Sequence, residues 1–185
     1  VSEFTKSEVL ARAKPKRVQV LYPGIDLDRF QPGGEKKDLV MTVASGSGGI
    51  IKLKGLDAFI GAAALLPEIR FLIVGLSDQD REELQSRSTK NVSLFGYVSR
   101  EELLALAEAM ACGCVPVVTE RGAIPEVVGD AGYYVPYGSA KATAEAIEKA
   151  LCSKNGIGLR KRVEERFSLR RREEALQSLL KSLMN

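Results

Sequence analysis

The chain has 185 residues, which fits one domain with short extensions. Its 45% of apolar residues suffice for a buried sheet with helical cover, and 28% charged residues with a mean hydropathy of -0.05 favour a soluble protein. The net charge of +3 is too small to indicate nucleic-acid binding, and neither a bilayer-spanning run nor a signal-peptide pattern is present, so we expect a cytoplasmic protein, peripheral at the membrane at most.

The side-chain inventory narrows the chemistry. The sequence has no histidine, which removes the commonest general base and the commonest metal ligand. The cysteines, Cys112, Cys114 and Cys152, are odd in number and lack paired C-x-x-C spacing, so they indicate neither a disulfide framework nor a zinc site. We expect no metal site, and any catalysis must rest on placed charges and hydrogen bonds or on a base from elsewhere.

Strand and helix patterns alternate along most of the chain. The expected strands cover 18–22, 39–44, 71–75, 92–96, 114–119 and 132–136. The expected helices are a first one capped by Thr5, then 56–66, one capped by Ser77, 105–113, 140–151, 159–167 and a last one capped by Ser168. This alternation predicts an α/β fold with a Rossmann-like, doubly wound parallel sheet.

A glycine-rich loop follows the strand at 39–44 and leads into a helix. Free backbone N–H groups and the helix dipole at such a place favour an anion. The dinucleotide fingerprint fails because Ile51 stands where a glycine is required, and the phosphate-loop motif fails because the order is Lys54-Gly55. An anion site and a plain surface turn remain as interpretations. The residues expected to contact the anion are Ser47, Gly48, Gly49, Lys52 and Lys54.

Glu108 is the only acidic residue between Leu103 and Val118. A charged side chain within an apolar run is costly unless it has a partner or reaches water. Two interpretations follow. Either Glu108 is a solvated position on its helix, or its carboxylate is held to accept hydrogen bonds from the hydroxyl groups of a ligand.

Two runs, from Glu108 to Val118 and from Gly122 to Val128, resemble the donor-sugar region of the group-one retaining glycosyltransferases. That family has the two-domain GT-B fold. The tetrapeptide from Lys54 to Asp57 is similar to the family's Lys-Gly-hydrophobic-Asp, and residues 95–98 are similar to its F-x-G-x-V. The resemblance extends from Val1 to about Ala175.

The resemblance implies roles for individual residues. Glu108, beside Ala109, would hold the ribose, because one carboxylate suits two vicinal hydroxyls. Tyr97 and Val98 would read the edge of the base. Lys54 would stabilise the departing diphosphate, with Lys52 or Ser47 in place of an arginine that the family has and this chain lacks. Glu126 lies in the matching G-x-x-P-E segment, and no role is assigned to it.

The resemblance also implies a domain plan. Residues 1–17 would end the interdomain connection, 18–167 would form the donor-binding domain, and 168–185 would be a helix crossing back to an N-terminal domain missing from this chain. Between Leu104 and Glu108 the family has a further strand and a first glutamate, whereas this chain has Arg100 eight positions before Glu108. Either residues are omitted, which we favour, or the sheet closes with fewer strands.

The expected function is therefore that of a glycosyltransferase donor domain. It would bind a UDP-, GDP- or ADP-sugar as substrate, with no other cofactor and no metal, for retaining transfer to a glycan or lipid acceptor. Lys54 and Glu108 would be its catalytic residues, and the chain alone is expected to be inactive. One alternative is a nucleotide-binding module without catalysis. The other is an unrelated nucleotide-dependent oxidoreductase, against which the failed fingerprint counts.

Overall fold

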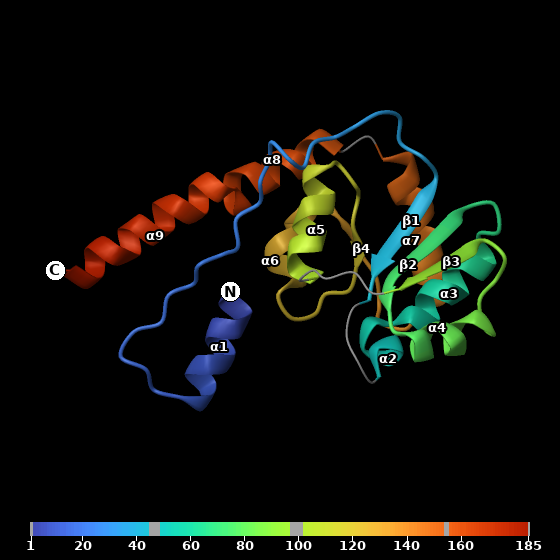
Figure 1. The fold of residues 1–185 in the computed structure, drawn as a ribbon, viewed down its shortest axis with the longest axis horizontal. Helices are drawn as coiled ribbons and strands as arrows, with labels where there is room; N and C mark the ends of the chain where they lie inside the picture. The colour runs from blue at the N-terminus through green and yellow to red at the C-terminus, as the bar shows by residue number, and fades with distance from the viewer. Residues whose placement is uncertain (1, 45–48, 97–101, 154–155, 185) are drawn as a thin grey trace.

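The computed structural model describes residues 2–44, 49–96, 102–153 and 156–184, which form two parallel sheets with helices around them (Figure 1). The first sheet has the order β1 (Leu39–Val43), β2 (Arg70–Leu76) and β3 (Val92–Gly96). The second pairs β4 (Val117–Val118) with β5 (Tyr133–Tyr134). Parallel pairing within each sheet confirms what the alternation of strands and helices predicted.

One face of the first sheet is covered by α3 (Leu56–Leu65), α4 (Asp78–Gln85) and α7 (Ala140–Cys152). Phe71 and Ile73 of β2 are fully buried on this face. The helices α3 and α7 pack closely because Gly61 has no side chain: a Cβ there would lie 2.7 Å from the Cβ of Ala140. This layer is the core that positions the carboxyl end of β1.

The opposite face of the first sheet is open in the described part of the chain. Its residues alternate with the buried ones, and Leu39, Met41 and Phe95 are 42%, 52% and 53% exposed. Parallel sheets are normally covered on both faces, since their connections place helices on each side. The exposed apolar side chains therefore show that no helix in the described ranges (2–44, 49–96, 102–153 and 156–184) covers this part of the sheet.

A second core surrounds the smaller sheet. It is formed by α5 (Glu102–Ala111), α6 (Ile124–Val128) and α8 (Gly156–Phe167), with a short 3-10 turn, η1 (Gly129–Ala131), before β5. Ile25 enters this core from the N-terminal segment and forms a parallel bridge with Ser168. The segment at Ile25 is thus fixed to the junction between α8 and the last helix.

The two terminal helices extend from this body. The first, α1 (Glu3–Arg12), has no buried residue, and the last, α9 (Leu169–Met184), projects away from the sheets (Figure 1). Leu176 and Leu180 of the expected apolar stripe are 39% and 52% exposed. No helix in the described ranges is both long and apolar enough to cross a membrane.

The structure corrects several local predictions. Ser2, and not Thr5, caps α1: its hydroxyl accepts a hydrogen bond from the Thr5 backbone N–H, so the helix begins three residues earlier than expected. Among the described residues, 18–22 pair with no strand, and the bridge near them joins Ile25 to Ser168. The strands expected at 114–119 and 132–136 pair over two residues each. Ser77 caps α4 as predicted, through the Asp80 backbone N–H.

The strand that the family has between the positions of Leu104 and Glu108 does not appear there in the structure. Helix α5 runs without a break from Glu102 to Ala111, so Leu104 and Glu108 lie on one helix and no strand separates them. Within the described residues, nothing pairs with the edge of β1 that faces away from β2, and the sheet is divided between β1 and β4. Over the part of the chain that the structure describes, the sheet therefore does not close with fewer strands, and the omission of residues remains a prediction.

Candidate functional site

The lysines expected at the anion site lie on a short helix that the sequence did not predict. This helix, α2 (Ile50–Lys54), stands between the glycine-rich loop and α3, and Lys52 and Lys54 occupy its last turn. Gly49 and Gly55 flank it with φ angles of 75° and 67°, a left-handed conformation that favours glycine. Ser47 and Gly48 of the expected anion site lie outside the described residues.

Lys54 is an exposed residue at the junction of α2 and α3. Partial desolvation of its ammonium group lowers the pKa of Lys54 from its ordinary value. Asp57 lies in the first turn of α3, three residues after Lys54, and forms an ion pair with Arg87. That carboxylate is therefore engaged with Arg87.

Glu108 is buried. It is 8% exposed, and its neighbours on α5 are fully or almost fully buried residues of the second core, Ala107, Met110 and Ala111. The interpretation of Glu108 as a solvated helix residue is therefore wrong. Ala109 follows it on the same helix, whereas Tyr97 and Val98, expected at the base, lie outside the described residues. Glu108 and Lys54 belong to different helices, α5 and α2.

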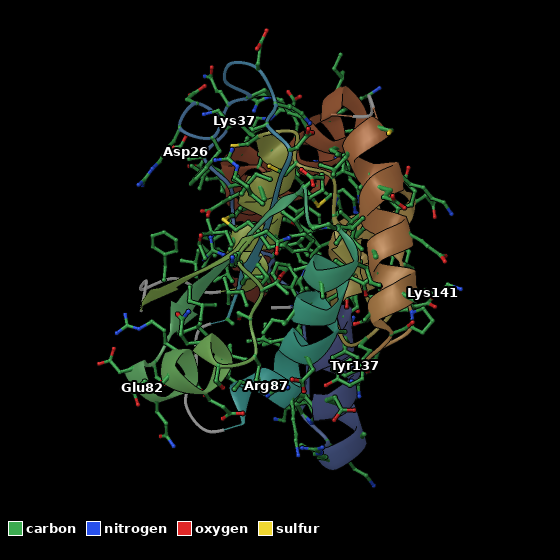
Figure 2. The ribbon with its side chains drawn as sticks, turned by 90° about the vertical axis from the view of Figure 1, so that its right-hand side faces the viewer. Asp26, Lys37, Glu82, Arg87, Tyr137 and Lys141 are labelled. Atoms are coloured by element: carbon green, nitrogen blue, oxygen red, sulfur yellow. The ribbon has the colours of Figure 1, made fainter. Side chains whose placement is uncertain are left out.

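A hollow of about 400 Å³ lies where β4 and β5 end. Its lining comes from two loops, and sequence reasoning did not single it out. The lining residues are Thr119, Glu120, Arg121, Tyr134, Val135, Pro136 and Tyr137. Figure 2 shows Tyr137 at the opposite end of the molecule from Lys37, which precedes β1. The hollow therefore opens at the carboxyl ends of the strands, where ligands bind in open parallel sheets.

Tyr137 joins this hollow to α2. Its hydroxyl donates a hydrogen bond to the Lys52 carbonyl oxygen, and its ring contacts Gly55, where an added Cβ would lie 3.4 Å from the ring. The Arg121 guanidinium stacks over the same ring, 4.6 Å from its centre. A single tyrosine thus brings together the loop after β4, the loop after β5 and the turn that carries Lys54.

Glu126, to which the sequence assigned no role, has one in the structure. Its carboxylate accepts hydrogen bonds from the backbone N–H groups of Glu3 and Phe4, at 2.8 and 2.7 Å, and from the Tyr22 hydroxyl at 2.7 Å. A carboxylate at a helix N-terminus is favoured by the free N–H groups and the helix dipole. Glu126 therefore fixes the start of α1 to α6, next to the loop at 119–123.

The same contacts shift two pKa values in opposite directions. Burial alone would raise the pKa of Glu126, but hydrogen bonds from Phe4, Tyr22 and Glu3 outweigh it and the pKa is lowered. Burial, and then the hydrogen bond to Glu126, raise the pKa of Tyr22 to about 12. The folded state therefore prefers an ionised Glu126 and a neutral Tyr22.

Alkaline pH is expected to loosen this contact. The raised pKa of Tyr22 means that its contribution to stability is complete below pH 10.0 and is lost as the pH rises to about 12. Melting temperatures of the wild type and of Tyr22→Phe should therefore converge over that range. Tyr133→Phe, which removes a hydroxyl that donates to the Lys149 carbonyl oxygen, is the control. A constant difference between wild type and Tyr22→Phe from pH 9 to 12 would contradict the assignment.

Comparison with known proteins agrees with the expected family. Residues 103–153 match the family model described as glycosyl transferases group 1. A D-inositol 3-phosphate glycosyltransferase of Mycobacteroides abscessus is 31% identical over 193 residues, a match that takes in 82% of this chain and 43% of that protein. A protein of the same name from Mycobacterium sp. strain JLS is 31% identical over 158 residues. The chain is related to the group 1 glycosyltransferases.

Several solved structures have a fold similar to that of this chain. TarM of S. aureus, crystallised with UDP, superposes with a TM-score of 0.76 at 15% identity, over 98% of this chain and 42% of that one. The pneumococcal O-GlcNAc transferase GtfA gives 0.66 at 19%, over 100% and 44%. The C-terminal domain of LpcC from Francisella tularensis gives 0.60 at 19%, over 79% and 100%. The predicted fold class, the C-terminal half of a GT-B glycosyltransferase, is confirmed.

Length separates this chain from its curated relatives. It spans 36% of the JLS protein and 43% of the M. abscessus protein. The match to the M. abscessus protein is 193 positions long but takes in 82% of the 185 residues of this chain, which is about 150 residues. About 40 positions of that protein therefore have no counterpart here, roughly the size of a strand and a helix.

Proposed function

We propose that this chain is the donor-binding half of a retaining glycosyltransferase and binds a nucleoside-diphosphate sugar, with UDP, GDP or ADP as the nucleotide. The acceptor, a glycan or a lipid, would be held by an N-terminal domain outside this chain. The observation that carries the proposal is the burial of Glu108, 8% exposed, on the helix that lies within the family match. A buried carboxylate with two acceptor oxygens suits the two vicinal hydroxyls of a ribose.

Transfer would proceed without a metal ion. Lys54 would offset the negative charge that develops on the departing diphosphate, because a cation placed before the reaction stabilises charge that grows in the transition state. The described residues contain no cluster of three or more His, Cys, Asp or Glu side chains suited to a metal. Since the acceptor would come from another domain, this chain alone is expected to bind the donor without transferring its sugar.

Calorimetric titration tests binding and metal dependence together. The purified chain is titrated with UDP, GDP and ADP, each with and without EDTA. We expect one of the three nucleotides to bind with an affinity that EDTA leaves unchanged, because the charges that hold it come from lysine and backbone N–H groups. Binding that disappears with EDTA would refute metal independence, and no binding of any of the three would refute the donor site.

The second candidate is a nucleotide-binding module without catalysis. Two observations favour it. About 40 positions of the M. abscessus protein have no counterpart in this chain, roughly the size of a strand and a helix, and the sheet is divided beside β1. Both candidates predict nucleotide binding. They differ in turnover, since only the first predicts transfer of sugar from a nucleotide-sugar when the chain is combined with its N-terminal domain.

A further inference from the structure

The hollow at the ends of β4 and β5 contains a cation that the proposed function leaves unused. Arg121 lies in the loop after β4, and its side chain is exposed. It forms no ion pair among the described residues, and its side-chain contact is the stacking on the Tyr137 ring. Glu120 lines the same hollow but is not paired with it. An arginine stays ionised at every physiological pH, so this positive charge is available to a ligand.

The stacking holds this charge beside the end of α2, the helix that carries Lys54. Tyr137 contacts Lys52 through its hydroxyl and Gly55 through its ring, and these two residues stand on either side of Lys54 in the chain. The Arg121 guanidinium lies 4.6 Å from the centre of that ring. Stacking on an aromatic ring restrains a guanidinium while leaving its N–H groups free to bind phosphate oxygens. The Arg121 cation, from the loop after β4, therefore lies next to the end of α2, far from it in the sequence.

We propose that Arg121 is a second phosphate-binding residue of the donor site, positioned by Tyr137 to contact the diphosphate together with Lys54. This inference rests on the proposed function, because it assigns the ligand of Arg121 as the diphosphate of the nucleotide. A diphosphate carries negative charge on two phosphoryl groups. Two cations on separate elements, α2 and the loop after β4, are therefore expected to bind a diphosphate more tightly than they bind a monophosphate. A planar guanidinium adds two parallel hydrogen bonds that an ammonium group does not make.

The test compares UDP with UMP on matched variants of the whole chain. Arg121→Gln is expected to weaken UDP binding about tenfold, the lower end for loss of a charge-assisted hydrogen bond at an exposed site, and to affect UMP much less. Arg29→Gln is the matched control: Arg29 is also stacked over an aromatic ring, 5.6 Å from the centre of Phe30, and it is exposed. It should leave the affinity for both nucleotides unchanged.

The outcomes separate this inference from the function on which it rests. If the wild type binds UDP, Lys54→Gln weakens binding and Arg121→Gln does not, the donor site stands and the role of Arg121 is refuted. An equal loss for UDP and UMP would also refute it, because a diphosphate ligand requires a difference. If the wild type binds neither UDP, GDP nor ADP, the proposed function itself fails. Tyr137→Leu should reproduce the Arg121→Gln loss, since it removes the ring that positions the guanidinium.

Discussion

Glu108→Gln is expected to weaken nucleotide binding ten- to hundredfold. The change replaces a charged acceptor by a neutral amide of nearly the same shape and removes a charge-assisted hydrogen bond worth roughly 1.5–3 kcal/mol. The structure strengthens this expectation, because a carboxylate that is 8% exposed cannot exchange its partner freely for water. The measurement is calorimetric titration of both proteins with the nucleotide that the wild type binds.

The stability of the same variant distinguishes a ligand-binding carboxylate from a structural one. If Glu108 serves the ribose, Glu108→Gln should melt close to the wild type; a structural carboxylate would lose stability and keep its affinity. Asp80→Asn provides the contrast: Asp80 is also buried, 9% exposed, but its carboxylate contacts the Ser77 hydroxyl at the cap of α4. We expect it to lower the melting temperature and leave the nucleotide affinity intact. An unchanged affinity in Glu108→Gln would remove the main support for the donor site.

Arg160→Met is expected to cost about 3 kcal/mol of stability, or roughly 6–12 °C in melting temperature. The Arg160 guanidinium donates hydrogen bonds to the carbonyl oxygens of Phe30, Leu27 and Ala111, at 2.6, 2.9 and 3.0 Å. These carbonyls belong to the N-terminal segment and to the end of α5, so one side chain joins both to α8. Methionine keeps much of the apolar stem but leaves three acceptors without their donor.

The adjacent position supplies the control for this change. Lys161 is exposed and forms a 3.8 Å ion pair with Glu165, which is also exposed. Exposed pairs of this kind contribute less than about 1 kcal/mol, so Lys161→Met should melt within about 2–4 °C of the wild type. Equal melting temperatures for Arg160→Met and Lys161→Met would show that the three carbonyl contacts do not stabilise the fold.

The sequence predicted the longer elements well because their signals are local. The apolar spacing of 56–66 and 140–151 predicted α3 and α7, and Ser77 capped its helix as expected. The failures lie where distant contacts decide. Residues 18–22 are strand-forming but pair with no strand in the described ranges. Ser2 replaces Thr5 as the cap of α1, at the place where the Glu126 carboxylate accepts hydrogen bonds from the first helical N–H groups.

The candidate site shows the same division. Lys54 and Glu108 were singled out by residue type and by resemblance, and the structure adds that one is exposed and the other buried. Arg121 and Tyr137 gave no usable signal, because a lone arginine and a lone tyrosine on separate loops have no pattern. Their meeting depends on the pairing of β4 with β5, which brings the two following loops together. The contact of Tyr137 with Lys52 of α2 joins residues 85 apart in the chain.

By itself, the sequence determined the parallel α/β class, the residues of the core helices and the relationship to glycosyltransferases, since these follow from periodicity and from contiguous motifs. Only the tertiary structure decided which polar groups work together: Glu126 with the start of α1, Arg160 with three carbonyl groups, and Arg121 with Tyr137 at the end of α2. It also decided that the sheet divides beside β1. The physical reason is that hydrogen bonds and ion pairs depend on distances of a few ångströms between distant segments, which local spacing does not encode.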